Sequence, residues 1–384
     1  MAASWTTTPI TAELVRGAIE LERTEHGVLP HRLPAWAREQ CADGQLAMAE
    51  AQPSGVRVVF RSAATTIELD TLRTRVGYRD LPLRPDGRYD LIVDGAAAGQ
   101  ASTTGGKVQL LDMATGAVEV QPGPVGTVCF DGLPDRAKDV EIWLPHTEIT
   151  ELAELRTDAP IEPAPDRGRR VWLHHGSSVS QGSNAASPAT TWPALAAARG
   201  NVELINLGFG GSALLDPFTA RTMRDTPADL ISVKLGINLV NADLMRLRAF
   251  GPAVHGFLDT IREGHPATPL LVVSSILCPI HETTPGPGAV DFSDGTLRFR
   301  ATGDPAESTA GKLTLTVVRE ELARIVTQRA DPNLHYLDGR ELYGEADAAE
   351  LPLPDRLHPD AAAHQRIGTR FVTLAFGPGG PFAG

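Results

Sequence analysis

The residues of this chain best suited to chemistry are one serine and a distant aspartate–histidine pair. Ser178 ends a Gly-Ser-Ser run, and Asp355 and His358 belong to the Asp-x-x-His-Pro run at residues 355–359. A hydroxyl, an imidazole and a carboxylate that orients the imidazole are the three parts of serine-based acyl transfer. Taken singly, the first run is typical of a turn and the second of a solvated loop before a helix. Together they predict nucleophilic catalysis by Ser178.

The spacing of the second run suits the orientation of a catalytic histidine. Asp355 precedes His358 by one turn of chain, so its carboxylate can accept a hydrogen bond from the ring and fix the tautomer. The other ring nitrogen then faces the nucleophile. Pro359 and Asp360 suit the first turn of a final helix. No second histidine or carboxylate stands at metal-ligand spacing, so we expect no metal site.

Two further positions could stabilise the negative oxygen of a tetrahedral intermediate. Gly211 follows a predicted strand, and its N–H is open to close approach because no side chain intervenes. Asn238 follows the next predicted strand and carries a carboxamide donor. The amide N–H of Ser178 is a third candidate donor. The alternatives are a tight turn at Gly211 and a helix N-cap at Asn238.

The elements that must position these residues alternate between strand and helix from residue 170 onward. This alternation predicts βαβ units and a parallel sheet. The carboxyl ends of parallel strands meet at one edge, so Ser178, Gly211 and Asn238 should converge there. Strands are expected at residues 171–173, 202–207, 230–235, 270–277 and 334–337. Helices are expected at residues 191–199, 244–263 (with a kink or break at Gly251-Pro252), 307–329 and 360–375.

The first part of the chain has a different pattern of apolar residues. Between residues 10 and 150 the apolar runs are short and are separated by turn signals such as Asp86-Gly87, which predicts an all-β sandwich or jelly roll. A proline-rich stretch follows and reads as a stiff connector. We therefore expect a β-sandwich domain at residues 1–157, a linker at 158–169 and an α/β domain at 170–384. A Gly- and Pro-rich insertion at 279–312, with a hairpin around Asp294-Gly295, is typical of a lid or binding loop.

Composition excludes several classes of partner. The net charge of −12 argues against a nucleic-acid or anionic-membrane surface, because both need a basic face. No window approaches 18 uninterrupted apolar residues, and the N-terminus lacks the pattern of a secretory signal. The three cysteines, Cys41, Cys129 and Cys278, fit neither a disulfide framework nor a zinc site. These features favour the cytoplasm, with no membrane partner.

Residues 170–376 resemble the SGNH (GDSL-type) hydrolase superfamily. Its four sequence blocks match here at the run ending in Ser178, at Gly211, at Asn238 and at the pair Asp355 and His358. The resemblance implies a three-layer α/β/α fold. It also implies that Ser178 is the nucleophile, His358 the general base and then acid, and Asp355 its orienting residue. The amides of Ser178 and Gly211 and the side chain of Asn238 would form the oxyanion hole.

The chain departs from the superfamily pattern at two positions. The usual Asp before the nucleophile is Ser177, and the usual Asp after the oxyanion Asn is Leu239. Neither is a reacting group, so the expected mechanism stands, while local hydrogen bonding and substrate fit differ. The whole chain is similar to a subgroup with an N-terminal β-sandwich like a carbohydrate-binding module. Within it, the layout is similar to acyltransferases that place salicylate on tetracycline-type polyketides.

The expected reaction is transfer of an acyl group from a thioester, such as acyl-CoA as co-substrate, to a hydroxyl of a bulky natural product. No other cofactor is expected, and the partners are small molecules; the oligomeric state stays open. One alternative is an esterase or carbohydrate deacetylase, because the same triad serves water and alcohols alike. A second is a non-catalytic binding protein with a decayed triad. Arg221 and Arg224 could attract an anionic donor, although exposed helix arginines are the simpler interpretation.

Overall fold

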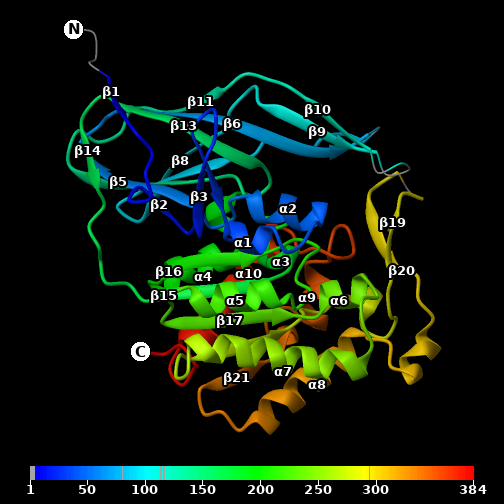
Figure 1. Ribbon diagram of the computed structural model, residues 1–384. Coiled ribbons are helices and arrows are strands. Elements are labelled where there is room, and N and C mark those ends of the chain that lie inside the picture. Colours follow the sequence, from blue (N-terminus) through cyan, green and yellow to red (C-terminus); the bar gives the residue numbers. More distant parts are fainter. Residues whose placement is uncertain (1–4, 80, 113–114, 116, 294) are drawn as a thin grey trace. The chain divides into compact units, whose positions relative to one another are not determined.

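The chain forms two compact units that are not continuous along the sequence (Figure 1). The computed structural model describes residues 5–79, 81–112, 115, 117–293 and 295–384. The first unit contains Met1–Pro34, Glu50–Gly168 and Ser187–Ala189, and the second contains Ala35–Ala49, Arg169–Ala186 and Thr190–Gly384. A short segment from the N-terminal part of the chain therefore belongs to the second unit.

The first unit is built from two β-sheets. Over the described residues, one sheet has the order β10-β9-β6-β13-β4-β3, with β1 on β13 and β11 on β6, and the other has the order β14-β5-β12-β7-β8, with β2 on β5. Neighbouring strands are antiparallel except β6 and β9. The first sheet contains β1 (Thr6–Thr8), β3 (Glu20–Arg23), β4 (Val28–His31), β6 (Ile67–Tyr78), β9 (Lys107–Leu111), β10 (Val118–Gln121), β11 (Gly126–Phe130) and β13 (Ile149–Thr157). The second contains β2 (Val15–Arg16), β5 (Arg57–Ser62), β7 (Tyr89–Val93), β8 (Ala96–Ala101), β12 (Lys138–Trp143) and β14 (Ile161–Pro163).

Apolar side chains from both sheets form one core. Leu69 of β6 and Leu155 of β13 come from the first sheet, and Phe60 of β5 and Ile142 of β12 come from the second; all four are fully buried. Alternate residues along these strands point inward, as expected when one face of each sheet is covered. The expected β-rich N-terminal part is confirmed. The predicted connector also contributes a strand, because β14 pairs with β5.

The second unit contains a five-stranded parallel sheet in the order β16-β15-β17-β18-β21. Its strands are β15 (Val171–Gly176), β16 (Glu203–Gly208), β17 (Leu230–Leu235), β18 (Leu270–Ser274) and β21 (Leu334–Leu337). The α-helices from α3 onward are α3 (Ser178–Gln181), α4 (Trp192–Gly200), α5 (Pro217–Asp225), α6 (Ile237–Asn241), α7 (Leu247–Gly264), α8 (Leu315–Arg329), α9 (Glu345–Glu350) and α10 (Ala361–Phe371). Shorter helical turns lie at Pro188–Thr190, Pro279–His281, Pro305–Ala310, Gly339–Glu341 and Val372–Phe376.

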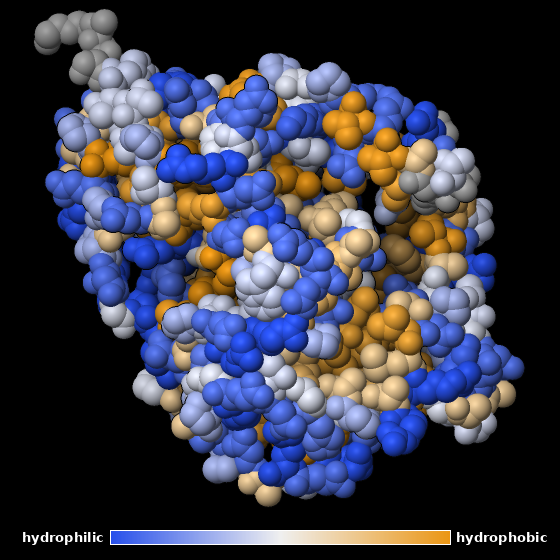
Figure 2. Space-filling view, viewed as in Figure 1, coloured by the Kyte–Doolittle hydropathy of each residue, from blue (hydrophilic) through white to orange (hydrophobic). Residues whose placement is uncertain are grey.

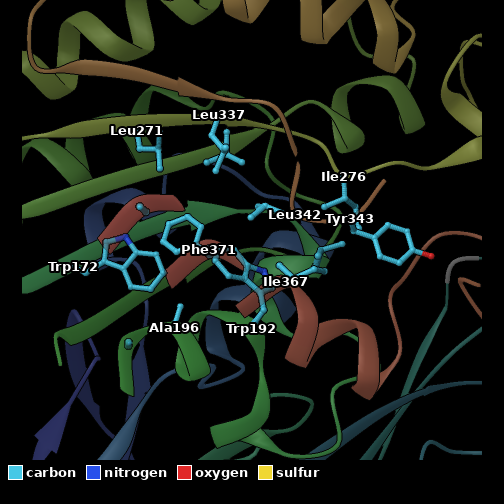
Figure 3. Packing of buried hydrophobic residues seen from close by; sticks show 14 of the residues in the cluster. Trp172, Trp192, Ala196, Leu271, Ile276, Leu337, Leu342, Tyr343, Ile367 and Phe371 are labelled. Atoms are coloured by element: carbon cyan, nitrogen blue, oxygen red, sulfur yellow. The ribbon is translucent and has the colours of Figure 1, made fainter. Parts of the chain in front are cut away.

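Helices cover both faces of this sheet. The helices α4 and α10 pack together on one face, and α5, α7 and α8 lie together on the other. On the first face, Trp172 of β15 stacks on Phe371 of α10 with ring centroids 5.0 Å apart, and Trp192 of α4 lies 5.1 Å from Phe371 (Figure 3). The expected three-layer α/β/α architecture is confirmed, and β15, an inner strand between β16 and β17, leads directly to Ser178.

The helix α7 is not broken where the sequence predicted a kink. It runs from Leu247 to Gly264 with Pro252 inside. Pro252 stands in the second turn, so it removes a single backbone hydrogen bond near the helix start. The preceding residue, Gly251, has no Cβ for the proline ring to contact, which relieves the usual clash.

Two helices come from a part of the chain for which the sequence predicted only strands, whereas the hairpin expected in the insertion does form. The helices α1 (Ala35–Arg38) and α2 (Gly44–Ala51) lie in a region predicted to be all-β. In the predicted insertion, β19 (Gly288–Asp291) and β20 (Arg298–Ala301) pair as an antiparallel hairpin. The expected turn includes Asp294, which lies outside the described residues.

Hydrophilic residues predominate on the face seen in Figure 2, and apolar residues are exposed in patches between them. Among the described residues, no helix is both long and apolar enough to cross a membrane. No group of three or more His, Cys, Asp or Glu side chains in the described part of the chain is arranged to hold a metal ion.

The buried ring of Phe371 tests the packing of the α4–α10 layer. Its contacts with Trp172 and Trp192 predict that Phe371→Ala lowers the free energy of unfolding by about 3–5 kcal/mol. Urea denaturation measures this loss. The control is Phe292→Ala, because Phe292 is 39% exposed. This variant should lower the free energy of unfolding by less than about 1 kcal/mol. Equal losses for the two variants would contradict this account of the core.

A buried histidine in α10 should make stability depend on pH. His364 is fully buried. Its Nδ1 accepts from the backbone N–H of Trp192 (3.2 Å) and its Nε2 donates to the Ser183 carbonyl (2.9 Å), so the ring must be neutral. Burial lowers the pKa of His364 to about 4 from an ordinary 6.5. Between pH 6.5 and about pH 4, His364 therefore binds a proton in the unfolded chain but not in the folded chain. The free energy of unfolding decreases as the pH falls through this range.

We expect this loss to reach roughly 3 kcal/mol for His364 alone between pH 7 and pH 4. Urea denaturation of the parent and of His364→Gln at several pH values measures it. The difference in unfolding free energy between the two proteins should shrink as pH falls. A difference that stays constant from pH 7 to pH 4 would show that His364 does not titrate as described.

Candidate active site

Ser178 lies at the sharp turn between β15 and α3. Gly176 is the last residue of β15, and Ser178 is the first residue of α3. The N–H groups of Ser180 and Gln181 both donate to the Ser177 carbonyl at 2.9 Å, which closes the turn. Since the chain leaves an inner strand and enters a helix here, the Ser178 side chain stands at the carboxyl end of the sheet.

A buried histidine holds α3 to the sheet. His174 of β15 contacts Ser180 Oγ through Nε2 (2.8 Å) and Ser232 Oγ of β17 through Nδ1 (2.7 Å). Burial, together with the nearby charges of His175 and Lys234, holds the pKa of His174 well below its ordinary value, so the ring is neutral. His175 contacts the Leu207 carbonyl at 2.8 Å. Both histidines occupy structural positions beside the serine.

The structure brings Ser178, His358 and Asp355 together in one hydrogen-bonded chain. His358 Nε2 lies 2.9 Å from Ser178 Oγ, and His358 Nδ1 lies 2.7 Å from Asp355 Oδ2. Ser178 and His358 are 180 positions apart in the sequence. Because the carboxylate faces Nδ1, that nitrogen carries the proton and Nε2 is left to accept one from the serine hydroxyl. The geometry suits general-base activation of Ser178.

Backbone groups fix the carboxylate of Asp355. Its Oδ1 accepts from the N–H groups of Leu357 (2.9 Å) and His358 (2.7 Å), while Oδ2 faces the ring of His358. Burial acts to raise the pKa of Asp355, but the hydrogen bonds from the His358 ring and from these backbone groups outweigh it, so the pKa lies below its ordinary value. The carboxylate is therefore ionised at neutral pH and can stabilise an imidazolium.

The hairpin of the insertion contacts the candidate base and its neighbour Asp355. Phe299 of β20 meets His358 edge-on, with ring centroids 5.6 Å apart. Its backbone N–H donates to the Asp355 carbonyl at 2.9 Å. The expected role of residues 279–312 as a lid or binding loop stays a prediction, but one aromatic residue from it contacts the candidate base.

The loop after β16 passes close to the serine. An added Cβ at Gly210 would lie 3.5 Å from Ser178 Cβ, and the Gly210 N–H donates to Gln181 Oε1 at 2.7 Å. Gly211 has a φ of +75°, a left-handed conformation that glycine adopts without strain. The Gly210–Gly211 peptide therefore follows directly after a residue that lies beside Ser178.

Asn238 is held with its amide nitrogen facing away from Ala213. Its Oδ1 accepts from the Ala213 N–H at 3.1 Å. A backbone N–H can only donate, so the oxygen must face Ala213 and the NH₂ group must face the other way. Asn238 follows β17, the neighbour of β15 in the sheet, and its side chain is 5% exposed. The orientation suits donation of Nδ2–H to a ligand.

The two departures from the superfamily pattern both lie in buried positions. Ser177 is 1% exposed, and within the described part of the chain its hydroxyl makes no hydrogen bond. Leu239 is fully buried.

The two arginines considered for attracting an anionic donor contact neighbouring side chains. Arg224 forms ion pairs with Asp225 and Glu263. The guanidinium of Arg221 lies 5.5 Å from the ring centre of Trp36.

Three residues near the site were not singled out from the sequence. Gln181 holds the Gly210 N–H, Phe299 contacts the His358 ring, and Gln45 Nε2 donates to the Gly210 carbonyl at 2.8 Å. Gln181 could have been suspected from its place in the serine loop. The other two come from distant segments, and nothing local marks them.

Two parts of the chain match known protein families. Residues 170–283 match the GDSL-like lipase/acylhydrolase family, and residues 14–152 match the N-terminal domain of SsfX3. The family match ends before Asp355 and His358, so the placement of that pair rests on the geometry. A search of curated protein sequences gave no match.

Solved structures that are similar over nearly the whole chain include one acyltransferase and several esterases. The salicylyl-acyltransferase SsfX3 from a tetracycline biosynthetic pathway is 28% identical, with a TM-score of 0.78 over 96% of this chain and 95% of that one. A family two carbohydrate esterase from Cellvibrio japonicus is 14% identical (TM-score 0.56, 96% of each chain). The acetyl xylan esterase Est2A from the rumen bacterium Butyrivibrio proteoclasticus is 12% identical (TM-score 0.55, 99% of each chain). The two esterases share the fold alone.

The family matches and the SsfX3 likeness confirm the resemblance stated from the sequence. The chain is an enzyme of the GDSL/SGNH type, with a GDSL-like segment at residues 170–283 and an SsfX3-like N-terminal domain at residues 14–152.

Proposed function

We propose that Ser178 forms an acyl-enzyme with His358 as general base and then acid, and Asp355 as the residue that orients His358. The single observation that carries this proposal is the continuous hydrogen-bonded chain from Ser178 Oγ through both ring nitrogens of His358 to Asp355 Oδ2. The amide N–H groups of Ser178 and Gly211 and the Nδ2 of Asn238 form the oxyanion hole. Each well-placed donor of this kind contributes about 3 kcal/mol.

The reaction proceeds in two balanced halves. Ser178 Oγ attacks the carbonyl of a thioester such as an acyl-CoA and gives its proton to His358 Nε2. The C–S bond breaks, and the thiol leaves with the proton from the imidazolium. An acceptor hydroxyl then gives its proton to His358 and attacks the acyl-serine, and Ser178 regains a proton as the new ester departs.

The proposed acceptor is a hydroxyl of a bulky natural product such as a tetracycline-type polyketide. SsfX3, a salicylyl-acyltransferase, is similar to this chain over nearly its whole length, which supports transfer to an alcohol. The unpaired thiols of Cys41, Cys129 and Cys278 support a reducing compartment such as the cytoplasm, where acyl thioesters are at hand.

A carbohydrate esterase is the second candidate. The carbohydrate esterases share this chain's two-part fold, and the triad chemistry is the same when water is the acceptor. Release of acetate from acetylated sugars in the absence of any alcohol would favour this candidate. Formation of an ester product with a polyketide alcohol at a rate above hydrolysis would favour the acyltransferase.

The acyl-enzyme can be detected directly. We expect incubation with a panel of acyl thioesters, salicylyl-CoA among them, to raise the intact mass of the protein by one acyl group. The adduct should be absent in Ser178→Ala, because the nucleophile is gone. An adduct of equal yield in Ser178→Ala, or turnover as fast as in the parent, would overturn the proposed mechanism.

Asp355→Asn tests the orienting role of the carboxylate. The two backbone N–H groups that now bind Oδ1 would hold the Asn oxygen, so its NH₂ group would face His358 Nδ1. Nδ1 would then be an acceptor and the proton would sit on Nε2, facing Ser178, where a base is needed. We expect kcat to fall about 10³- to 10⁴-fold in ester hydrolysis assays.

The matched control for this change is Asp360→Asn, five residues along the chain. Asp360 caps α10 by accepting from the Ala363 N–H at 2.8 Å, a role that Asn fills equally well. Its kcat should match that of the parent. An Asp355→Asn enzyme with parental kcat would show that the carboxylate does not set the tautomer of His358.

A further inference from the structure

The Gly210–Gly211 peptide group of the candidate oxyanion hole accepts a hydrogen bond from Gln45, which lies far in sequence from the four superfamily sequence blocks. The carbonyl of Gly210 and the N–H of Gly211 belong to the same peptide unit. The carbonyl accepts a hydrogen bond of 2.8 Å from Gln45 Nε2. The preceding N–H, that of Gly210, donates to Gln181 Oε1 at 2.7 Å. Both sides of this short loop are therefore fixed by glutamine side chains.

The contact at the carbonyl controls the direction of the Gly211 N–H. A peptide group is planar and trans, so its C=O and N–H point in opposite directions in one plane. Neither Gly210 nor Gly211 has a side chain that restricts rotation of this plane, and Gly211 lies in the left-handed region at φ +75°. A donor on the carbonyl also polarises the N–H on the far side of the same group.

The side chain of Gln45 also packs against Gly211 itself. A Cβ added at Gly211 would lie 3.1 Å from Gln45 Cγ and 3.2 Å from Gln45 Nε2. Gln45 belongs to α2 and to the segment Ala35–Ala49, which forms part of the second unit. Gln40 accepts a hydrogen bond from Arg221 of α5, and Trp36 lies under the same guanidinium. The segment is thus fixed beside the loop by contacts independent of Gln45.

We propose that Gln45 is a positioning residue for catalysis: its carboxamide holds the Gly210–Gly211 peptide so that the Gly211 N–H points at the developing oxyanion. This inference rests on the proposed function, in which Gly211 is an oxyanion donor. It assigns to a segment of the N-terminal sequence a part in transition-state stabilisation, with no contact to the substrate.

The test compares the parent with Gln45→Ala and Gln45→Glu, using p-nitrophenyl acetate as substrate and a boronic acid as inhibitor. A boronic acid bonded to Ser178 Oγ is tetrahedral and carries an anionic oxygen, so it reports on the oxyanion hole. Gln45 is exposed, so both variants should fold and melt like the parent. Glu keeps the length of the side chain but cannot donate at neutral pH.

We expect kcat to fall about tenfold in both variants with KM unchanged, less than the loss for deleting a donor outright. The inhibition constant of the boronic acid should rise by the same factor. Gln40→Ala is the matched control: it removes the other glutamine contact of the segment and should leave kcat and inhibition unchanged.

The variants distinguish a failure of the positioning role of Gln45 from a failure of the proposed function. If the parent turns over and Ser178→Ala does not, but Gln45→Ala keeps parental kcat and inhibition, the positioning role is wrong and the proposed function stands. If Gln40→Ala loses as much as Gln45→Ala, the segment acts through its packing and the inference is overturned. A parent whose hydrolysis is unaffected by Ser178→Ala overturns the proposed function, and the inference with it.

Discussion

The contact between Ser178 Oγ and His358 Nε2 is the interaction on which the proposed function depends. It joins two loops that are 180 residues apart in sequence. Each loop adjoins a packed element: Ser178 begins a helix directly after the inner strand β15, and His358 stands just before α10, which has a buried face. A displacement of either element by about an ångström would break the hydrogen bond and remove the base from the nucleophile.

Burial explains why His358 is suited to this task and its neighbours are not. His174 and His364 lie in the interior, and desolvation lowers the pKa of each, so both remain neutral and serve as fixed donors and acceptors. His174 ties α3 to β17, and His364 ties α10 to the chain after α3. His358 instead faces the ionised carboxylate of Asp355, which can compensate a positive ring. The neutral histidines thus hold in place the two loops that carry the reactive pair.

Much of the fold and of the candidate site could be predicted because it is encoded locally. The strands β17 and β21 lie where their apolar runs predicted them, and the Asp-x-x-His spacing allowed the hydrogen bond that Asp355 makes to His358. The unbroken helix α7 could not be predicted from Pro252 alone, because the glycine before it removes the clash. The docking of residues 35–49 in the second unit depends on long-range contacts such as Gln40 to Arg221, which no local period signals.

Labelling with a fluorophosphonate tests the central contact most directly, because the reagent reacts with a serine only when a neighbouring base activates it. The parent should gain the mass of one phosphonyl group, mapped by peptide analysis to Ser178, and His358→Ala should label at a rate lower by orders of magnitude. Labelling of His358→Ala at the parental rate, or of another residue, would contradict the account.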